Sequence, residues 1–222
     1  MKSIFLYFIF LLLANSCNNS SHQNSSNNEI AQNIAFPSLA INKNSYLKGT
    51  EDTLFIQSNF ITAEIRPNGF LYWGIKLADS LKLTSDMFVS RAYYYEIDTL
   101  LYLFLEESDM DCGASNVVKI NIPQRKIIWK AGMNGFNLGL PYLKDNYAYV
   151  TTIGIIGKLN LMKGEYIYKF SDLYDNKKYS FNKFDTILFS ENLTYFISEN
   201  YSSGHLDTVI VNEESNELII KK

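Results

Sequence analysis

Histidine and cysteine are scarce in this chain, which has two of each among 222 residues. A zinc site built from these two residue types takes three or four of them, so their number nearly excludes one. The sequence also lacks a Gly-x-Ser-x-Gly nucleophile motif, a glycine-rich phosphate loop and a histidine-bearing metal motif. We therefore expect a protein that is not an enzyme and that holds no metal and no cofactor.

Positive charge is not concentrated anywhere in the sequence, and the net charge is −3. Nucleic-acid binding depends on clustered Lys and Arg side chains, so nucleic acid is not an expected partner. Charged residues make up only 19% of the chain and hydrophobic residues 47%, which is enough apolar material for a sizeable core.

A helical period is also missing, because after the first seventeen residues no segment sustains apolar side chains at a spacing of 3.6. Ala78–Phe88 is the one candidate for a turn or short helix. The chain is instead rich in aromatic residues, with 16 Tyr and 15 Phe. These residues suit the half-buried surface of a sheet, so the composition predicts an all-β fold.

The amino terminus has the form of an export signal. Ile4–Leu13 is an unbroken apolar run of ten residues, about 15 Å of helix, which is half of a bilayer core of about 30 Å. A run of this length before small residues is typical of a secretory leader. Leu13–Cys17 then resembles a lipobox, which implies cleavage before Cys17 and attachment of diacylglycerol and palmitate to that cysteine.

An Asn- and Ser-rich segment follows the cysteine, with nine such residues among the eleven of Asn18–Asn28. Such a segment buries too little apolar surface to offset its ordering entropy, and we interpret it as a flexible tether that includes His22. The predicted organisation is a signal peptide at 1–16, a lipidated cysteine and tether at 17–35, and one β-repeat domain at 36–222.

Cys112 is the second cysteine. If Cys17 carries lipid, Cys112 has no partner and is expected to be a shielded thiol. The alternative is an ordinary leader cut at another position, and in that case a Cys17–Cys112 disulfide becomes possible.

Two short sequence patterns, here called phrases, recur along the rest of the chain. The first is an acidic turn residue followed by an apolar run, and its copies begin at Asp52, Asp98, Asp145 and Asp185. The second is strand, tight turn, strand. Counted from its last residue before the turn (position 0), a turn residue falls at +4 and a large apolar residue at +8. The four copies are Ile65–Gly69–Trp73, Asn121–Arg125–Trp129, Asn160–Gly164–Tyr168 and Asn212–Asn216–Ile220.

The +4 preference has a physical cause, since Gly and Asn tolerate the positive φ that tight hairpin turns require. Arg125 departs from this preference, and we expect its turn to use another geometry.

The third copy, residues 146–170, resembles the PQQ-type β-propeller repeat, and the first two copies resemble it more loosely. The resemblance implies that the +8 aromatics Trp73, Trp129 and Tyr168 pack between neighbouring blades. Four units predict repeated antiparallel β-meanders in a propeller-like fold of about four blades. A β-sandwich or a small barrel built from the same meanders is the alternative.

Candidate sites outside the repeats are few. Asp109 and Asp111 lie in the one dense acidic cluster, but the twelfth loop position is Ile120 where a calcium loop has a bidentate Glu. We interpret the cluster as a solvated loop, and His205 as part of another loop.

Tyr93, Tyr94 and Tyr95 are a possible binding surface. Side chains alternate between faces in a strand, so at least one of the three is expected to face solvent or a groove. The competing interpretation is that they fill the packing between sheets.

These features predict a non-catalytic lipoprotein of the bacterial cell envelope that presents a β-repeat surface to a protein partner. The outer membrane is the first candidate for the membrane that holds its anchor. A glycan- or small-ligand-binding module is the alternative, and a small hydrolase is the third possibility. Exposed aromatics beside carboxylates in one groove would favour glycan binding.

Overall fold

The computed structural model describes residues 53–57, 61–74, 79–84, 88–108, 113–171, 173, 182–200, 204 and 206–219. All of them belong to one compact unit, Phe36–Lys222. Several predicted features lie outside the described residues, namely the signal peptide, Cys17, the tether, Asp109, Asp111, Cys112 and His205.

Sixteen strands form four sheets of four strands each. The first sheet contains β1 (Leu54–Gln57), β2 (Thr62–Ile65), β3 (Phe70–Tyr72) and β4 (Ser80–Lys82). The second contains β5 (Phe88–Ile97), β6 (Leu100–Ser108), β7 (Gly113–Asn121) and β8 (Lys126–Gly132). The third contains β9 (Tyr142–Lys144), β10 (Tyr147–Thr152), β11 (Ile155–Asn160) and β12 (Glu165–Phe170). The fourth contains β13 (Asn182–Ser190), β14 (Leu193–Asn200), β15 (Leu206–Asn212) and β16 (Glu217–Ile219).

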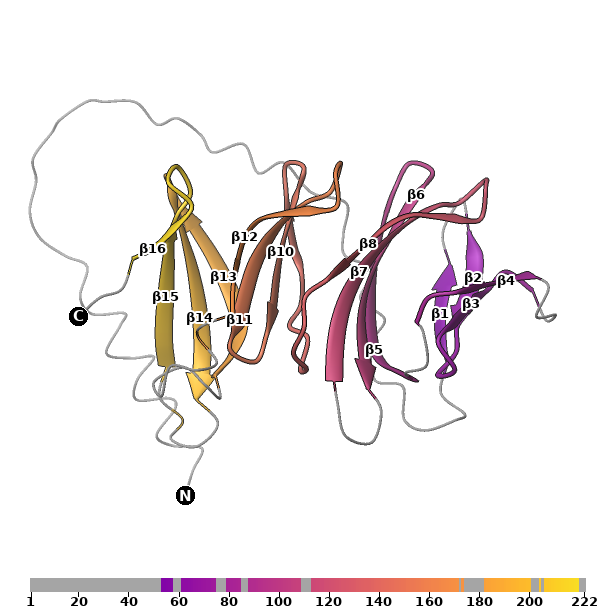
Figure 1. The fold of residues 1–222 in the computed structure, drawn as a ribbon, viewed down its shortest axis with the longest axis horizontal. Helices are drawn as coiled ribbons and strands as arrows, with labels where there is room; N and C mark the ends of the chain where they lie inside the picture. The colour runs from indigo at the N-terminus through magenta and orange to yellow at the C-terminus, as the bar shows by residue number, and fades with distance from the viewer. Residues whose placement is uncertain are drawn as a thin grey trace, which may run out of the picture. The chain divides into compact units, whose positions relative to one another are not determined.

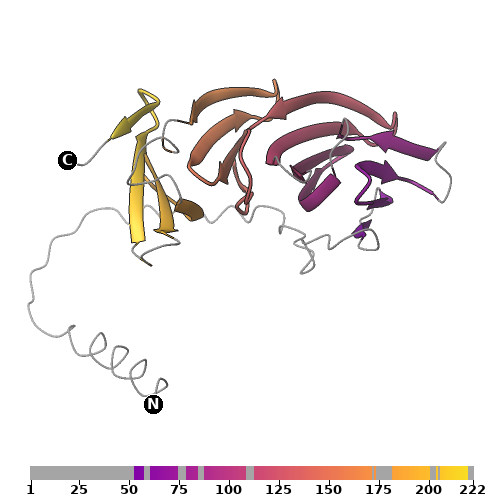
Figure 2. The same ribbon diagram turned by 60° about the horizontal axis from the view of Figure 1, so that its bottom comes forward.

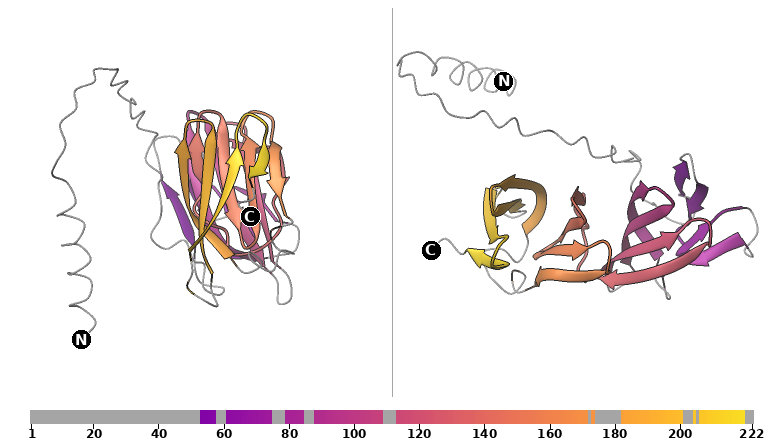
Figure 3. Two further views of the ribbon diagram at one scale, coloured as in Figure 1. Left: turned by 90° about the vertical axis from the view of Figure 1, so that its left-hand side faces the viewer. Right: turned by 90° about the horizontal axis from the view of Figure 1, so that it is seen from above.

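Every sheet is an antiparallel meander, because each strand pairs with the next one in the sequence. The four sheets stand side by side in chain order (Figure 1), and the same order is seen in the turned views of Figures 2 and 3. The predicted fold class, all-β with repeated antiparallel units in a propeller-like arrangement, is confirmed.

The hairpin turns confirm the predicted role of the +4 position. Gly69, Gly164 and Asn216 have φ of 81°, 74° and 57°. The expectation that Arg125 needs another geometry is wrong, because its φ is 52° and its turn has the same left-handed residue. Arg has no special tolerance for this region, so the surrounding hairpin imposes the conformation.

Asparagine at position 0 holds these turns through its side chain. The Oδ1 atom of Asn160 accepts hydrogen bonds from the backbone N–H groups of Met162 and Lys163, at 2.9 and 3.1 Å. Asn212 accepts two such bonds in the fourth sheet, and Asn121 accepts one in the second. A side-chain oxygen that bonds the backbone two or three residues ahead favours a turn, which explains why Asn recurs here.

The first recurrent phrase needs one correction. Asp98 and Asp145 occupy the turns between the first two strands of their sheets, with φ of 53° and 55°. Asp185 lies inside β13, and the matching turn residue of the fourth sheet is Glu191, with φ of 48°. The expectation of a turn or short helix in Ala78–Phe88 is also wrong for its described residues, which include strand β4.

The core is made by neighbouring sheets packing face to face. Each of three buried clusters draws its residues from two sheets that follow one another in the chain. The +8 aromatics take part as predicted, with Trp73 against the first cluster, Trp129 against the second and Tyr168 buried in the third. Each +8 side chain therefore joins its own sheet to the next one.

Candidate binding site

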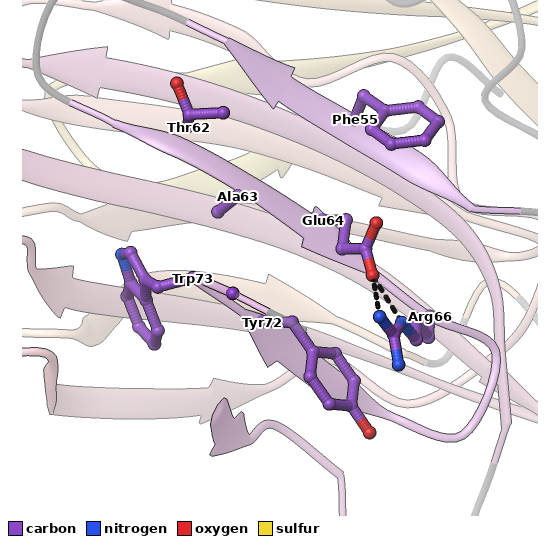
Figure 4. Close-up of a pocket in the computed structure, with 8 residues that line it drawn as sticks. Phe55, Thr62, Ala63, Glu64, Arg66, Tyr72 and Trp73 are labelled. Carbon is purple, nitrogen blue, oxygen red and sulfur yellow. Dashed lines mark hydrogen bonds and ion pairs between the residues drawn. The ribbon is translucent and has the colours of Figure 1, made fainter. Parts of the chain in front are cut away.

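An open groove of about 240 Å³ lies over the first sheet (Figure 4). It is lined by Phe55, Thr62, Ala63, Glu64, Arg66, Tyr72, Trp73 and Gly74. Its floor comes from β1, β2 and β3, which run side by side.

Strand alternation places Phe55, Glu64 and Tyr72 on one face, whereas Ala63 and Trp73 pack against the first core cluster. Leu54 and Ile56 pack in the first core cluster, so Phe55 between them points the other way. Phe55 pairs with Glu64, and Glu64 pairs with Tyr72 on the next strand. The three side chains thus form one cross-strand row on the face of the first sheet that points away from the second sheet.

A charged pair crosses the groove. The carboxylate of Glu64 accepts hydrogen bonds from the guanidinium of Arg66 (dashed lines in Figure 4). The guanidinium carbon also lies 3.9 Å from the ring centroid of Tyr72, a cation–π contact. The Tyr72 hydroxyl accepts a hydrogen bond from Nδ2 of Asn68 at 2.9 Å. The polar part of the groove is therefore already ordered by its own contacts.

Trp73 separates this groove from a second hollow, which is lined by Thr99, Ile122, Pro123 and Arg125 beside the same indole. The Arg125 guanidinium lies 5.5 Å from the Trp73 ring and 3.7 Å from a carboxylate oxygen of Asp79. In the part of the chain that the structure describes, the buried indole Nε1 of Trp73 has no hydrogen-bond partner.

The groove occupies positions that the other three sheets bury completely. Phe55 is 62% exposed, whereas the residues at its register position in the following sheets, Leu101, Ala148 and Thr194, are all 0% exposed. Glu64 likewise takes the position of three buried apolar residues, which are Ile120, Leu159 and Val211. In the later sheets this face lies against the preceding sheet, so the groove marks the one such face, among the described sheets, that none of them covers.

A partly buried polar cluster lies between the third and fourth sheets. The Glu213 carboxylate pairs with Nζ of Lys158 at 2.5 Å and accepts hydrogen bonds from the hydroxyls of Tyr149 (3.2 Å), Tyr168 (3.1 Å) and Thr194. Lys158 and Tyr168 belong to the third sheet, and Thr194 and Glu213 follow from the fourth. The cluster therefore fastens the two sheets together.

The electrostatics of this cluster are consistent with a structural role. Burial alone would raise the pKa of Glu213, but Lys158 and the donated hydrogen bonds outweigh it and lower the pKa. Burial is also the main reason that the pKa values of Tyr149 and Tyr168 are raised, with the Glu213 charge adding to it. At neutral pH the cluster therefore holds a carboxylate and two neutral phenols.

Two further carboxylates, at the edge of the acidic cluster in the sequence, have internal partners. Glu107 accepts hydrogen bonds from Lys130 (3.1 Å) and Asn116 (2.7 Å). Glu106 accepts one from the backbone N–H of Leu138 at 2.7 Å. Across the described residues, no group of three or more His, Cys, Asp or Glu side chains is placed to hold a metal ion.

The three consecutive tyrosines contribute mainly to packing. Tyr94 is 7% exposed in the first core cluster and Tyr95 is 6% exposed in the second. Tyr93 is half-buried against the second cluster. The Tyr95 hydroxyl donates to the Pro141 carbonyl at 3.2 Å. Their burial leaves Tyr94 and Tyr95 little surface for a ligand, in agreement with the packing interpretation.

The groove was missed by the sequence interpretation, although a signal was present. Glu64 precedes position 0, where the other three copies have Ile120, Leu159 and Val211. A charged residue at an otherwise apolar repeat position indicates an uncovered face. The Glu213 cluster left no comparable signal, because its members are distant in the sequence.

Comparisons with known proteins identify no family. No family model and no curated protein sequence matches the chain. Within the described residues, no helix is long and apolar enough to cross a membrane.

Solved structures match only distantly. Apo AztD from Citrobacter koseri has 13% identity over 74% of this chain and 44% of its own, with a TM-score of 0.42. A member of the DUF4221 family from Bacteroides vulgatus has 14% identity over 58% and 41%, with a TM-score of 0.31. The computationally designed Ika8 protein has 8% identity over 69% and 56%, with a TM-score of 0.30. The chain spans less than two thirds of the length of each of these proteins.

Proposed function

We propose that this chain is a non-catalytic lipoprotein of the bacterial cell envelope that binds a protein partner through the outer face of its first sheet. The leader, the lipobox-like sequence at Cys17 and the polar tether support anchoring in a bacterial membrane. The outer membrane is the first candidate. The tether then holds the β-repeat domain away from the lipid surface.

The observation that carries the proposal is the exposure of Phe55. A large aromatic side chain stands 62% exposed at a position that is fully buried in each of the other three sheets. Exposed aromatic residues rimmed by polar ones are characteristic of protein-binding surfaces, where Tyr, Trp, Phe and Arg are enriched. In this groove the exposed ring of Phe55 lies beside the polar side chains of Glu64 and Arg66, and the Tyr72 ring under Arg66 is buried.

The contacts of the buried Glu107 and of the partly buried Glu106 and Glu213 support a non-catalytic role. Glu106, Glu107 and Glu213 are each engaged by backbone or side-chain donors that connect different sheets or segments. A general acid or base needs an open path to a substrate atom, and these carboxylates are instead occupied by structural contacts.

Glycan binding is the second candidate, and one observation favours it. Phe55 lies beside Glu64 and Arg66 in a single groove, which combines an exposed aromatic face for stacking with charged hydrogen-bonding groups. In that case the groove would take a sugar ring in place of a protein side chain.

A photocrosslinking experiment distinguishes these candidates. A photoreactive amino acid replaces Thr62, which is exposed in the groove, or Met162, which is 64% exposed on a turn of the third sheet. In intact envelopes of the native host, we expect a protein adduct from position 62 and none from position 162. The absence of any protein adduct at 62, together with glycan retention that Phe55→Ala abolishes, would overturn protein binding in favour of the second candidate.

A further inference from the structure

The repeated hairpin occupies a different place in the first sheet from the one it has in the other three. In the later sheets the hairpin with a left-handed residue at +4 joins the third strand to the fourth, as β7 to β8, β11 to β12 and β15 to β16. In the first sheet the same hairpin, with Gly69 at +4, joins the second strand β2 to the third strand β3. β1 is therefore the counterpart of β6, β10 and β14, which are the second strands of the later sheets.

Among the described residues, the first sheet has no counterpart of the first strand of the later sheets. That strand is β5, β9 or β13, and each of these pairs with the second strand of its sheet. In the first sheet β2 is the one described strand that is hydrogen-bonded to β1. The other edge of a strand carries backbone N–H and C=O groups that a further strand can pair with. This edge of β1, which borders the groove, is therefore a docking site for an extended segment.

The turn that joins the first strand to the second has a sequence counterpart just before β1. In the second sheet this turn begins the sequence Asp-Thr-Leu at 98–100, and Asp98 has a φ of 53°. The same three residue types occur in the same order at 52–54, where the leucine begins β1. The chain before residue 52 thus has the sequence position of a first strand.

The later sheets also fix the register that such a strand would have. The residue three places after the acidic turn residue pairs with the residue two places before it. In the second sheet Leu101 pairs with Glu96, and in the third sheet Ala148 pairs with Leu143. The fourth sheet keeps this register around Glu191. The pairing therefore follows from the turn, whichever side chains occupy the strand.

We propose that residues 48–51 of this chain pair as a strand with the free edge of β1. They lie outside the described residues. The register of the later sheets places Thr50 opposite Phe55 and Lys48 opposite Gln57. Directly opposite side chains share a face of the sheet, so this strand adds a threonine and a lysine to the groove face. The chain then runs to the lipid anchor from a point beside the groove. The inference goes beyond the proposed function, because it does not depend on what the groove binds.

Pairs of cysteines test this register in the purified full-length lipoprotein. Two matched pairs, Thr50→Cys with Phe55→Cys and Lys48→Cys with Gln57→Cys, should each form an intramolecular disulfide under mild oxidation. In a two-residue hairpin these are pairs of the non-hydrogen-bonded type, whose Cα atoms lie about 4.5 Å apart, within the range that a disulfide bridges. The measurement is the loss of two free thiols, counted by maleimide labelling of the denatured protein.

Exchanging the partners provides the controls, Thr50→Cys with Gln57→Cys and Lys48→Cys with Phe55→Cys. Each new cysteine then occurs in one matched and one mismatched pair, so its own reactivity cannot explain a difference. The Cα atoms of a mismatched pair would lie about 7–8 Å apart, too far for a disulfide, so both thiols should remain free. Phe55 and Gln57 are exposed, and their replacement leaves the core intact. All variants also carry Cys112→Ser.

Equal disulfide formation in matched and mismatched pairs would overturn the inference, and so would free thiols in all four variants after oxidation. Disulfides that double the mass on a non-reducing gel would overturn it as well, because they would show the segment of another copy at this edge. In each of these cases a crosslink from position 62 to an envelope protein would leave the proposed function standing.

Discussion

At the residue scale, the hairpin turns show that the backbone conformation at a repeat position is more regular than the residue type that occupies it. Position +4 is left-handed in all four hairpins, whether Gly69, Arg125, Gly164 or Asn216 occupies it. Glycine is required only where the turn also meets another side chain at close range. Gly164 is such a place, because it lies against the Trp129 ring.

Gly164→Ala should therefore lower the free energy of unfolding by about 3 kcal/mol, from left-handed strain of 1–2 kcal/mol and overpacking against Trp129. Urea denaturation provides the measurement. Gly204→Ala is the matched control, since Gly204 has φ of 68° with nothing within 4 Å of an added Cβ. It should cost only the strain, and equal losses in the two variants would disprove the contact with Trp129.

The Glu213 cluster is the second residue-scale feature that carries a prediction. Removing one member of a partly buried ion pair leaves the other without compensation, so Glu213→Gln should lower the free energy of unfolding at pH 7 by about 2 kcal/mol. The lowered pKa of Glu213 sets the pH dependence. The stabilisation that the Glu213 carboxylate provides is complete above the pKa of this group in the unfolded state, near 4.5. It is lost as the pH falls through the lower pKa of the folded state.

The difference in stability between wild type and Glu213→Gln should accordingly shrink when denaturation is measured below pH 4.5. Glu217→Gln changes an exposed residue of β16 and serves as the control, with little effect at any pH. A Glu213→Gln deficit that stays constant from pH 7 to pH 3 would mean that the carboxylate charge does not stabilise the contact.

At the element scale, the strands and the hairpin phase of the repeat were predictable, because alternation and turn chemistry are local. Position +4 is left-handed in all four hairpins, and the +8 aromatics Trp129 and Tyr168 pair with the residues two places before position 0. The turn in the fourth sheet was not predictable in the same way. Asp185 matched the phrase, but Phe184 is buried in the third core cluster and β13 extends past Asp185 to Ser190, so packing moved the turn to Glu191.

Contacts between sheets could not be predicted from the sequence, because they join residues that are distant along the chain. Glu213 meets Lys158 and Tyr149 across 55 and 64 residues of chain. No local pattern encodes such a distance, so the cluster appears only once the sheets are placed against each other. The groove depends likewise on which face of the first sheet remains uncovered.

The +8 aromatic is the element that joins one sheet to the next, and its removal provides a test. Trp129→Ala should lower the free energy of unfolding by about 3–5 kcal/mol, as truncation of a large core aromatic does. The neighbouring Ile128→Ala is the control, because Ile128 is 50% exposed and its loss should change stability by less than about 0.5 kcal/mol. Similar losses for both variants would contradict the role of Trp129 in joining the second sheet to the third.

At the scale of the whole molecule, the functional proposal joins three parts of the chain: an anchor, a tether and a domain with a groove on the outer face of its first sheet. The domain supplies the surface, but only the anchor determines where that surface works. In this proposal, attachment at Cys17 determines which partners the groove can meet, so the lipid anchor is its central claim.

Metabolic labelling with an alkyne analogue of palmitate tests that claim most directly. The wild type and Cys112→Ser should take up the label and sediment with membranes, because the thiol of Cys17 remains. Cys17→Ser should take up none and appear in the soluble fraction. Label retained by Cys17→Ser, or a native mature protein whose first residue is not Cys17, would contradict the account.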